Sequence, residues 1–104
     1  MTLIDRFRRQ CYSTLMIAEK DRMVISRVAR EYGVQKVLLF GSAADPEREA
    51  EDIDLGVMGI DPGRFFDFYG DLMLGLTKPV DVVDLALDTK FNALVKRDGI
   101  LLYG

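Results

Sequence analysis

A short apolar run between two glycines is the feature that most constrains the fold of this chain. Residues 34–40, which lie between Gly33 and Gly41, are rich in β-formers. Within them, Val37 to Phe40 is apolar at every position. A strand without polar alternation is typical of a sheet that is covered on both faces. The chain has 104 residues, a length typical of one domain. We therefore expect one small α/β domain over residues 1–104, with helices packed on a sheet.

The N-terminal part of the chain is predicted to be helical. Residues 3–32 contain neither Gly nor Pro, and their apolar residues recur at four-residue spacing. The helix is either continuous or broken near residues 18–21, where Asp21 would cap a second segment. In the broken case, residues 1–18 form an extra N-terminal helix. Gly33 is placed to end the helical region as a C-cap glycine.

Composition excludes several classes of protein. A hydrophobic share of 49% with 30% charged residues excludes disorder, and a net charge of −3 disfavours a nucleic-acid partner held by its phosphates. The lone Cys11 forms no intramolecular disulfide, and the charged N-terminus has no apolar signal core, so we expect a cytoplasmic protein without a membrane partner. The chain has no His, so catalysis would depend on carboxylates, hydroxyls, lysines or bound metals.

The second half of the chain alternates predicted strands and helices. Strands are expected at residues 53–57, 80–87 and 100–103, the last at a sheet edge, and helices at 64–76 and 89–97. Residues 45–51 are polar and predict a surface loop. The apolar face of the 64–76 helix, from Phe65 to Met73, is wider than one small sheet covers.

The turn after the first strand is a candidate phosphate site. Gly41 has no side chain to block a phosphate, and backbone N–H groups and the Ser42 hydroxyl are suitable donors. Alone, a Gly-Ser pair after a strand is more often a simple turn.

Three carboxylates form a candidate metal site. Asp52 and Asp54 point the same way from an alternating strand, and their mutual repulsion favours a divalent cation between them. Asp81 interrupts the next apolar strand and completes a triad if the two strands are neighbours. Such a triad suits Mg²⁺, which combines one or two carboxylates with water and phosphate oxygens. Asp84 falls on the opposite face of that strand and is expected to be a strand-end or surface residue.

Taken in order, these motifs resemble the minimal nucleotidyltransferase domain of the DNA polymerase β superfamily. The resemblance is carried by Leu39-Phe40-Gly41-Ser42, then after nine residues Asp52-Ile53-Asp54-Leu55-Gly56-Val57, then Val80-Asp81-Val82-Val83-Asp84-Leu85 and Gly99-Ile100-Leu101-Leu102-Tyr103. It covers the chain from about Glu19 to the C-terminus. It implies a small polymerase β-like domain, with a short mixed sheet on which helices pack.

The resemblance also implies an activity, the transfer of a nucleoside monophosphate from an NTP to a hydroxyl group. Gly41 and Ser42 would bind the triphosphate, and Asp52 and Asp54 would bind the metals. Asp81 would bind the catalytic metal or help to deprotonate the attacking hydroxyl. Two Mg²⁺ ions would stabilise the attacking and leaving oxygens, so the reaction would not need a histidine. ATP as the NTP is implied by the resemblance alone, since no residue is identified as reading the base.

Many minimal members of the family are encoded beside a small helical partner of the HEPN class, in toxin–antitoxin pairs. By resemblance, this chain would be the antitoxin that transfers AMP onto its partner. In a second hypothesis, the chain has the same fold but no catalytic activity, and it acts as a partner-binding module. The sequence leaves homo-oligomer formation open.

Overall fold

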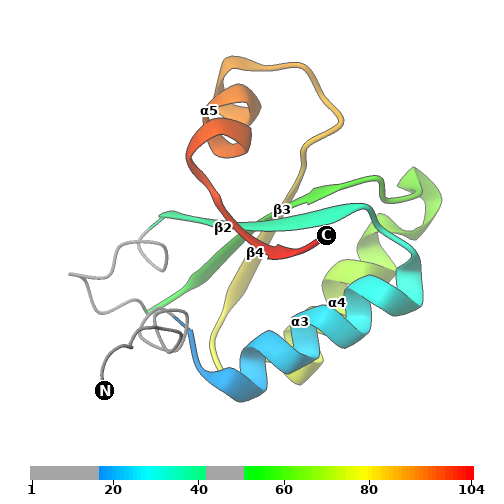
Figure 1. The fold of residues 1–104 in the computed structure, drawn as a ribbon. Helices are drawn as coiled ribbons and strands as arrows, with labels where there is room; N and C mark the ends of the chain where they lie inside the picture. Colours follow the sequence, from blue (N-terminus) through cyan, green and yellow to red (C-terminus); the bar gives the residue numbers. More distant parts are fainter. Residues whose placement is uncertain (1–16, 42–50) are drawn as a thin grey trace.

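The computed structural model describes residues 17–41 and 51–104 of the chain (Figure 1). In chain order the elements are α3 (Glu19–Tyr32), β2 (Lys36–Phe40), β3 (Ile53–Met58), the 3-10 helix η2 (Pro62–Arg64), α4 (Phe65–Gly75), β4 (Val80–Asp84), α5 (Lys90–Asp98) and β5 (Ile100–Tyr103). Most of the predicted helix over residues 1–18, most of the 45–51 loop and Ser42 lie outside the described residues.

Helix α3 begins near the predicted break, but its start corrects one prediction. The N-cap residue is Ala18, with extended backbone and no side-chain hydrogen bond, and Asp21 lies inside the first turn. The Asp21 side chain is buried and accepts hydrogen bonds from the Thr77 backbone N–H at 3.0 Å and the Thr77 hydroxyl at 2.6 Å. Asp21 is not a cap because its carboxylate is satisfied by a segment 56 residues away in the chain.

The end of α3 confirms the predicted C-cap. Gly33 has φ of 65° in the left-handed region, which suits glycine, and its N–H contacts the carbonyls of Ala29 and Arg30. The chain then enters β2, where Val37, Leu38 and Leu39 are all buried. The two-sided burial expected from the apolar run is therefore present.

The four strands form a mixed sheet with the order β4-β3-β2-β5. Strand β2 pairs antiparallel with β3 and with β5, and β3 pairs parallel with β4. Strand β5 lies at an edge, as predicted. In Figure 1, α3 and α4 lie on one side of the sheet and α5 on the other. This arrangement confirms the predicted α/β fold with a short mixed sheet.

The two faces of the sheet build cores of different size. The larger core lies beneath α3 and α4 and includes Ile25, Leu39, Leu55 and Phe68, all fully buried. The smaller core, on the α5 side, consists of Leu38, Leu85 and Val95, with Phe40, Met58 and Val83 packed against it. The second face is thus only partly filled with apolar side chains.

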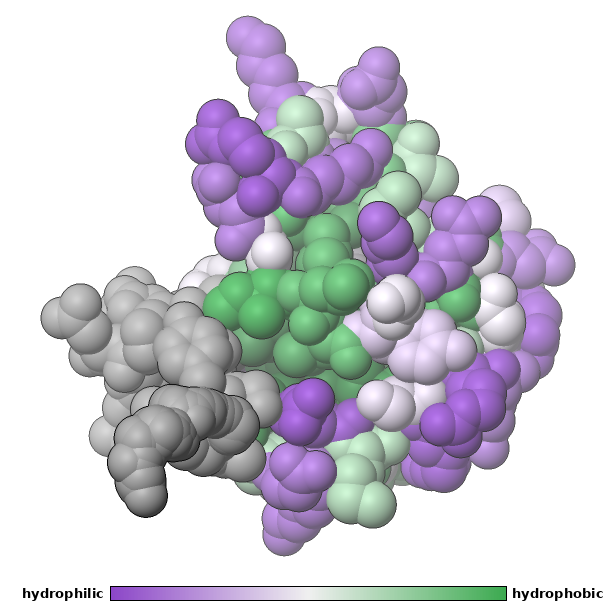
Figure 2. Space-filling model, in the orientation of Figure 1, coloured by the Kyte–Doolittle hydropathy of each residue, from purple (hydrophilic) through white to green (hydrophobic). Residues whose placement is uncertain are grey.

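Apolar residues also reach the surface. Helix α4 buries Phe68 and Leu72 but leaves Phe66 and Leu74 exposed by 83% and 88%, so its apolar face is wider than the sheet covers, as predicted. Figure 2 shows further apolar surface between the hydrophilic flanks of α5 and α3, where β5 lies in Figure 1. Among residues 17–41 and 51–104, no helix is long and apolar enough to cross a membrane.

Candidate active site

The sheet brings two of the predicted carboxylates together. Asp54 on β3 is in register with Asp81 on β4, and these strands are parallel neighbours. Adjacent strands lie about 4.8 Å apart, and residues in register share a face. Ile53 and Leu55 belong to the larger core, so alternation directs Asp54 to the other face. The condition for an acidic cluster, that the two strands adjoin, is met.

Electrostatics connect these two carboxylates with the third. Asp52 precedes β3 and is exposed, and Asp54 is half-buried. Burial raises the pKa of the Asp54 carboxyl above its ordinary value, and the negative charges of Asp81 and then Asp52 raise it further. The charges of Asp81 and Asp52 therefore both act on Asp54 near the start of β3, and a bound cation would relieve this repulsion.

Gly41 lies directly against this cluster. Its φ is 73°, in the left-handed region, and a Cβ at this position would run into Oδ2 of Asp54. No other residue fits without displacing the carboxylate. The turn that was predicted to bind phosphate therefore ends β2 beside the predicted metal ligands, whereas Ser42 lies outside the described residues.

The donor set of this cluster suits a hard cation. Carboxylate oxygens are the side-chain ligands that Mg²⁺ prefers, and Mg²⁺ usually takes only one or two of them together with substrate phosphates. Within the part of the chain that the structure describes, no three or more His, Cys, Asp or Glu side chains form a metal-binding group. Asp54 and Asp81 supply two carboxylates of the kind that Mg²⁺ prefers.

The comparisons with known proteins agree with this arrangement. The family model "Polymerase beta, Nucleotidyltransferase" matches residues 24–104, which include Gly41, Ser42 and all three carboxylates. The chain belongs to this nucleotidyltransferase family. No curated protein sequence matches the chain.

Two solved structures share the fold of this nucleotidyltransferase. A toxin–antitoxin crystal structure with AMP-PNP matches with a TM-score of 0.66 and 27% identity, over 80% of this chain and 73% of that chain. The toxin–antitoxin MntA-HepT matches with a TM-score of 0.61 and 26% identity, over 81% of this chain and 70% of that chain. The fold is therefore related to that of MntA in a toxin–antitoxin pair.

Sequence reasoning missed one residue beside the site of this nucleotidyltransferase. Tyr69 was assigned only to the apolar face of its helix, yet its hydroxyl lies 3.0 Å from Oδ1 of Asp81 and 3.1 Å from the carbonyl oxygen of Val80. Partial burial, and then the bond to Asp81, raise the pKa of the Tyr69 hydroxyl above its ordinary value. The only feature of the sequence that pointed to this contact is that a tyrosine stands among the phenylalanines of this helix.

Asp84 has the structural position that was expected. It is the last residue of β4, and its Oδ1 accepts a hydrogen bond from the backbone N–H of Ala86 at 2.9 Å. Its backbone carbonyl accepts a bond from the buried side chain of Asn92, which ties α5 to the strand end. Asp84 therefore stabilises the turn after β4.

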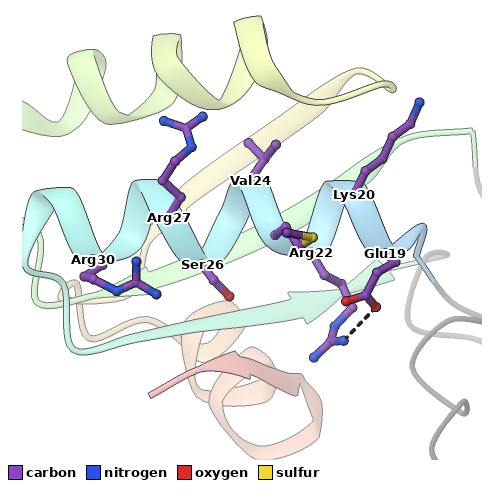
Figure 3. A pocket seen from close by; sticks show the side chains of 8 residues that line it. Glu19, Lys20, Arg22, Val24, Ser26, Arg27 and Arg30 are labelled. Carbon is purple, nitrogen blue, oxygen red and sulfur yellow. Dashed lines mark hydrogen bonds and ion pairs between the residues drawn. The ribbon is translucent and has the colours of Figure 1, made fainter.

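The surface hollows help to place the site of the nucleotidyltransferase. A hollow of about 570 Å³ lies along α3, and its lining includes Ser26, Arg27 and Arg30 but none of the site carboxylates (Figure 3). A smaller hollow of about 330 Å³ adjoins Gly41 and is lined by Phe40 and Phe91 among others. Of these two hollows, the second adjoins the candidate site through Gly41.

Proposed function

We propose that this chain is a Mg²⁺-dependent nucleotidyltransferase that transfers AMP from ATP to a hydroxyl group. The pairing of Asp54 with Asp81 beside Gly41 carries this proposal. The acceptor oxygen forms a bond to the α-phosphorus, the bond from that phosphorus to the bridging oxygen of the β-phosphate breaks, and pyrophosphate leaves. The hydroxyl proton passes to Asp81 or to solvent.

Each residue has a defined task in this reaction. Asp52, Asp54 and Asp81 would hold the metal, with two ions expected when the nucleotide is bound. Bound Mg²⁺ stabilises the charge that develops on the attacking and leaving oxygens. Gly41 lets the triphosphate approach the backbone, and Ser42 donates its hydroxyl to a phosphate oxygen. The structural relative that contains AMP-PNP supports an adenine nucleotide as the substrate.

We place the acceptor hydroxyl on a partner protein. The structural relatives are toxin–antitoxin pairs, which supports an antitoxin role with a partner protein, and we propose that this partner is a small helical protein of the HEPN class. Exposed apolar residues on α4, with Phe66 and Leu74 the most exposed, support protein binding. The acidic net charge of −3 favours a protein over a nucleic acid. We propose that this reaction takes place in the cytoplasm.

Calorimetric titration of MgATP into the wild type and Asp54→Asn tests the nucleotide site. We expect Mg²⁺-dependent micromolar binding by the wild type and at least tenfold weaker binding by the variant. Asp84→Asn is the matched control, because it removes an equal charge from β4 and keeps the acceptor for Ala86. Folded wild type that binds none of the four NTPs would contradict the proposal.

The acceptor is tested by incubation of the chain and a co-expressed HEPN partner with ATP labelled at the α-phosphate. We expect label on the partner with the wild type and none with Asp54→Asn. If Asp54→Asn still neutralised the toxin, the binding-module hypothesis would replace the enzymatic one.

A further inference from the structure

We propose that Tyr69 is a positioning residue that holds the Asp81 carboxylate in the orientation needed to bind metal. This inference rests on the proposed function, since it assigns Asp81 to the metal site. The Tyr69 hydroxyl acts only through Oδ1 of Asp81, which lies 3.0 Å away.

Asp81 needs such a support because of its place in the sheet. It lies on β4, an edge strand, and its side chain is exposed. An exposed aspartate samples several rotamers, and metal binding has to restrict them. A hydrogen bond to one carboxylate oxygen orients the group and leaves its second oxygen as a metal ligand. Partners of this kind, outside the ligand set, orient metal ligands in many proteins.

The Tyr69 ring is itself held in place. It packs against the larger core and meets the ring of Phe65 edge to face, with centroids 6.1 Å apart and an interplanar angle of 84°. The same hydroxyl lies 3.1 Å from the Val80 carbonyl oxygen, on the residue next to Asp81, so its single hydrogen is shared between two acceptors, of which the charged carboxylate is the stronger. The hydroxyl is thus held by the packed α4 layer beside the edge strand, where it can fix a carboxylate on that strand.

The chain offers a matched control for this bond. The Tyr32 hydroxyl donates to Oδ2 of Asp71 at 2.6 Å, which is also a tyrosine–carboxylate bond between two elements. Tyr32 packs edge to face against Phe68, with ring centroids 5.5 Å apart. Asp71 belongs to α4 and is not among the predicted site residues. Tyr32→Phe therefore removes a similar bond away from the carboxylate cluster.

The test is titration of Mn²⁺ into wild type, Tyr69→Phe and Tyr32→Phe, with free Mn²⁺ followed by electron paramagnetic resonance. Calorimetry with MgATP is run on the same samples, and thermal unfolding confirms that they are folded. We expect about tenfold weaker binding of metal and of MgATP by Tyr69→Phe, in line with the loss of a partner that orients a metal ligand. Tyr32→Phe should stay within twofold of the wild type. In an Asp81→Asn background, Tyr69→Phe should have no further effect.

Two results would overturn the assignment while leaving the proposed function intact. One is wild-type affinity of Tyr69→Phe for both Mn²⁺ and MgATP. The other is an equal loss in Tyr69→Phe and Tyr32→Phe, which would indicate a general effect of lost hydroxyls. A folded wild type that bound neither Mn²⁺ nor any nucleotide would reject both the proposed function and the role of Tyr69.

Discussion

Asp21 and Asp54 are both withdrawn from solvent, but their surroundings differ in kind. Asp21 is only 1% exposed, and Thr77 supplies two hydrogen-bond donors to its carboxylate. Asp54 is half-buried, and its pKa is raised by this burial first and then by the negative charges of Asp81 and Asp52. A buried carboxylate with donors stabilises a fold. A carboxylate surrounded by other carboxylates weakens the fold until a cation binds, so the contrast separates a structural acid from a candidate metal ligand.

The largest expected change in stability comes from removing Asp21, the structural acid. Asp21→Ala should lower the free energy of unfolding by about 3 kcal/mol, because two hydrogen bonds to a charged group are lost and the Thr77 N–H loses its acceptor. Urea unfolding measures the loss. The exposed Asp88→Ala should stay within about 0.5 kcal/mol of the wild type. Similar losses in both variants would remove the distinction.

Stabilisation of the fold by bound MgATP should depend on Asp54. MgATP at about 100 times its Kd should stabilise the wild type by about 2.7 kcal/mol, through preferential binding to the folded state. Asp54→Asn should lose most of this increment, and Asp84→Asn should keep it. Thermal unfolding with MgATP, and with ATP plus EDTA, gives the comparison. An increment that survives in Asp54→Asn would place the nucleotide elsewhere.

Gly41→Ala should weaken both the fold and the site. Alanine in the left-handed region costs about 1–2 kcal/mol, and the new methyl group would displace the Asp54 carboxylate. We expect that loss in urea unfolding together with weaker MgATP binding in calorimetry. Gly70→Ala is the matched control, because it lies within α4 with open space around its Cβ and should be neutral or slightly stabilising. Unchanged nucleotide binding in Gly41→Ala would contradict the role of this turn.

The smallest expected effect is that of Asp54→Asn on the metal-free protein. It should raise the free energy of unfolding, whereas Asp21→Ala should lower it. The raised pKa of Asp54 means that the folded state binds its proton more tightly than the unfolded state does. This group therefore lowers stability as pH rises from its unfolded-state pKa through its raised folded-state pKa, and the full penalty is present above the folded-state value. Asp54→Asn should raise the free energy of unfolding of the metal-free protein by less than about 1 kcal/mol, because solvent screens the repulsion. Urea unfolding in EDTA at pH 7 would test this, and destabilisation by the variant would contradict it.

Local patterns predicted most of the elements. The apolar run of β2, the alternation of β3 and the glycine after α3 each depend on neighbours within a few residues, and each appears where it was expected. The start of α3 lies within the predicted break, but the cap was wrongly assigned to Asp21, because that side chain interacts with Thr77, far away in the chain. Tyr69 was missed for the same reason, since its hydroxyl makes a polar contact with Asp81 on β4, which is distant in sequence.

The sequence by itself determined the residue types and their order: a glycine turn after a buried strand, two aspartates on the next strand and a third aspartate on a later one. These features are local, because strand period and backbone freedom depend on adjacent residues. Only the tertiary structure decided that Asp54 and Asp81 are in register, that Gly41 touches Asp54 and that Tyr69 reaches Asp81. Strand pairing and helix packing set those distances, and both follow from burying the whole core at once.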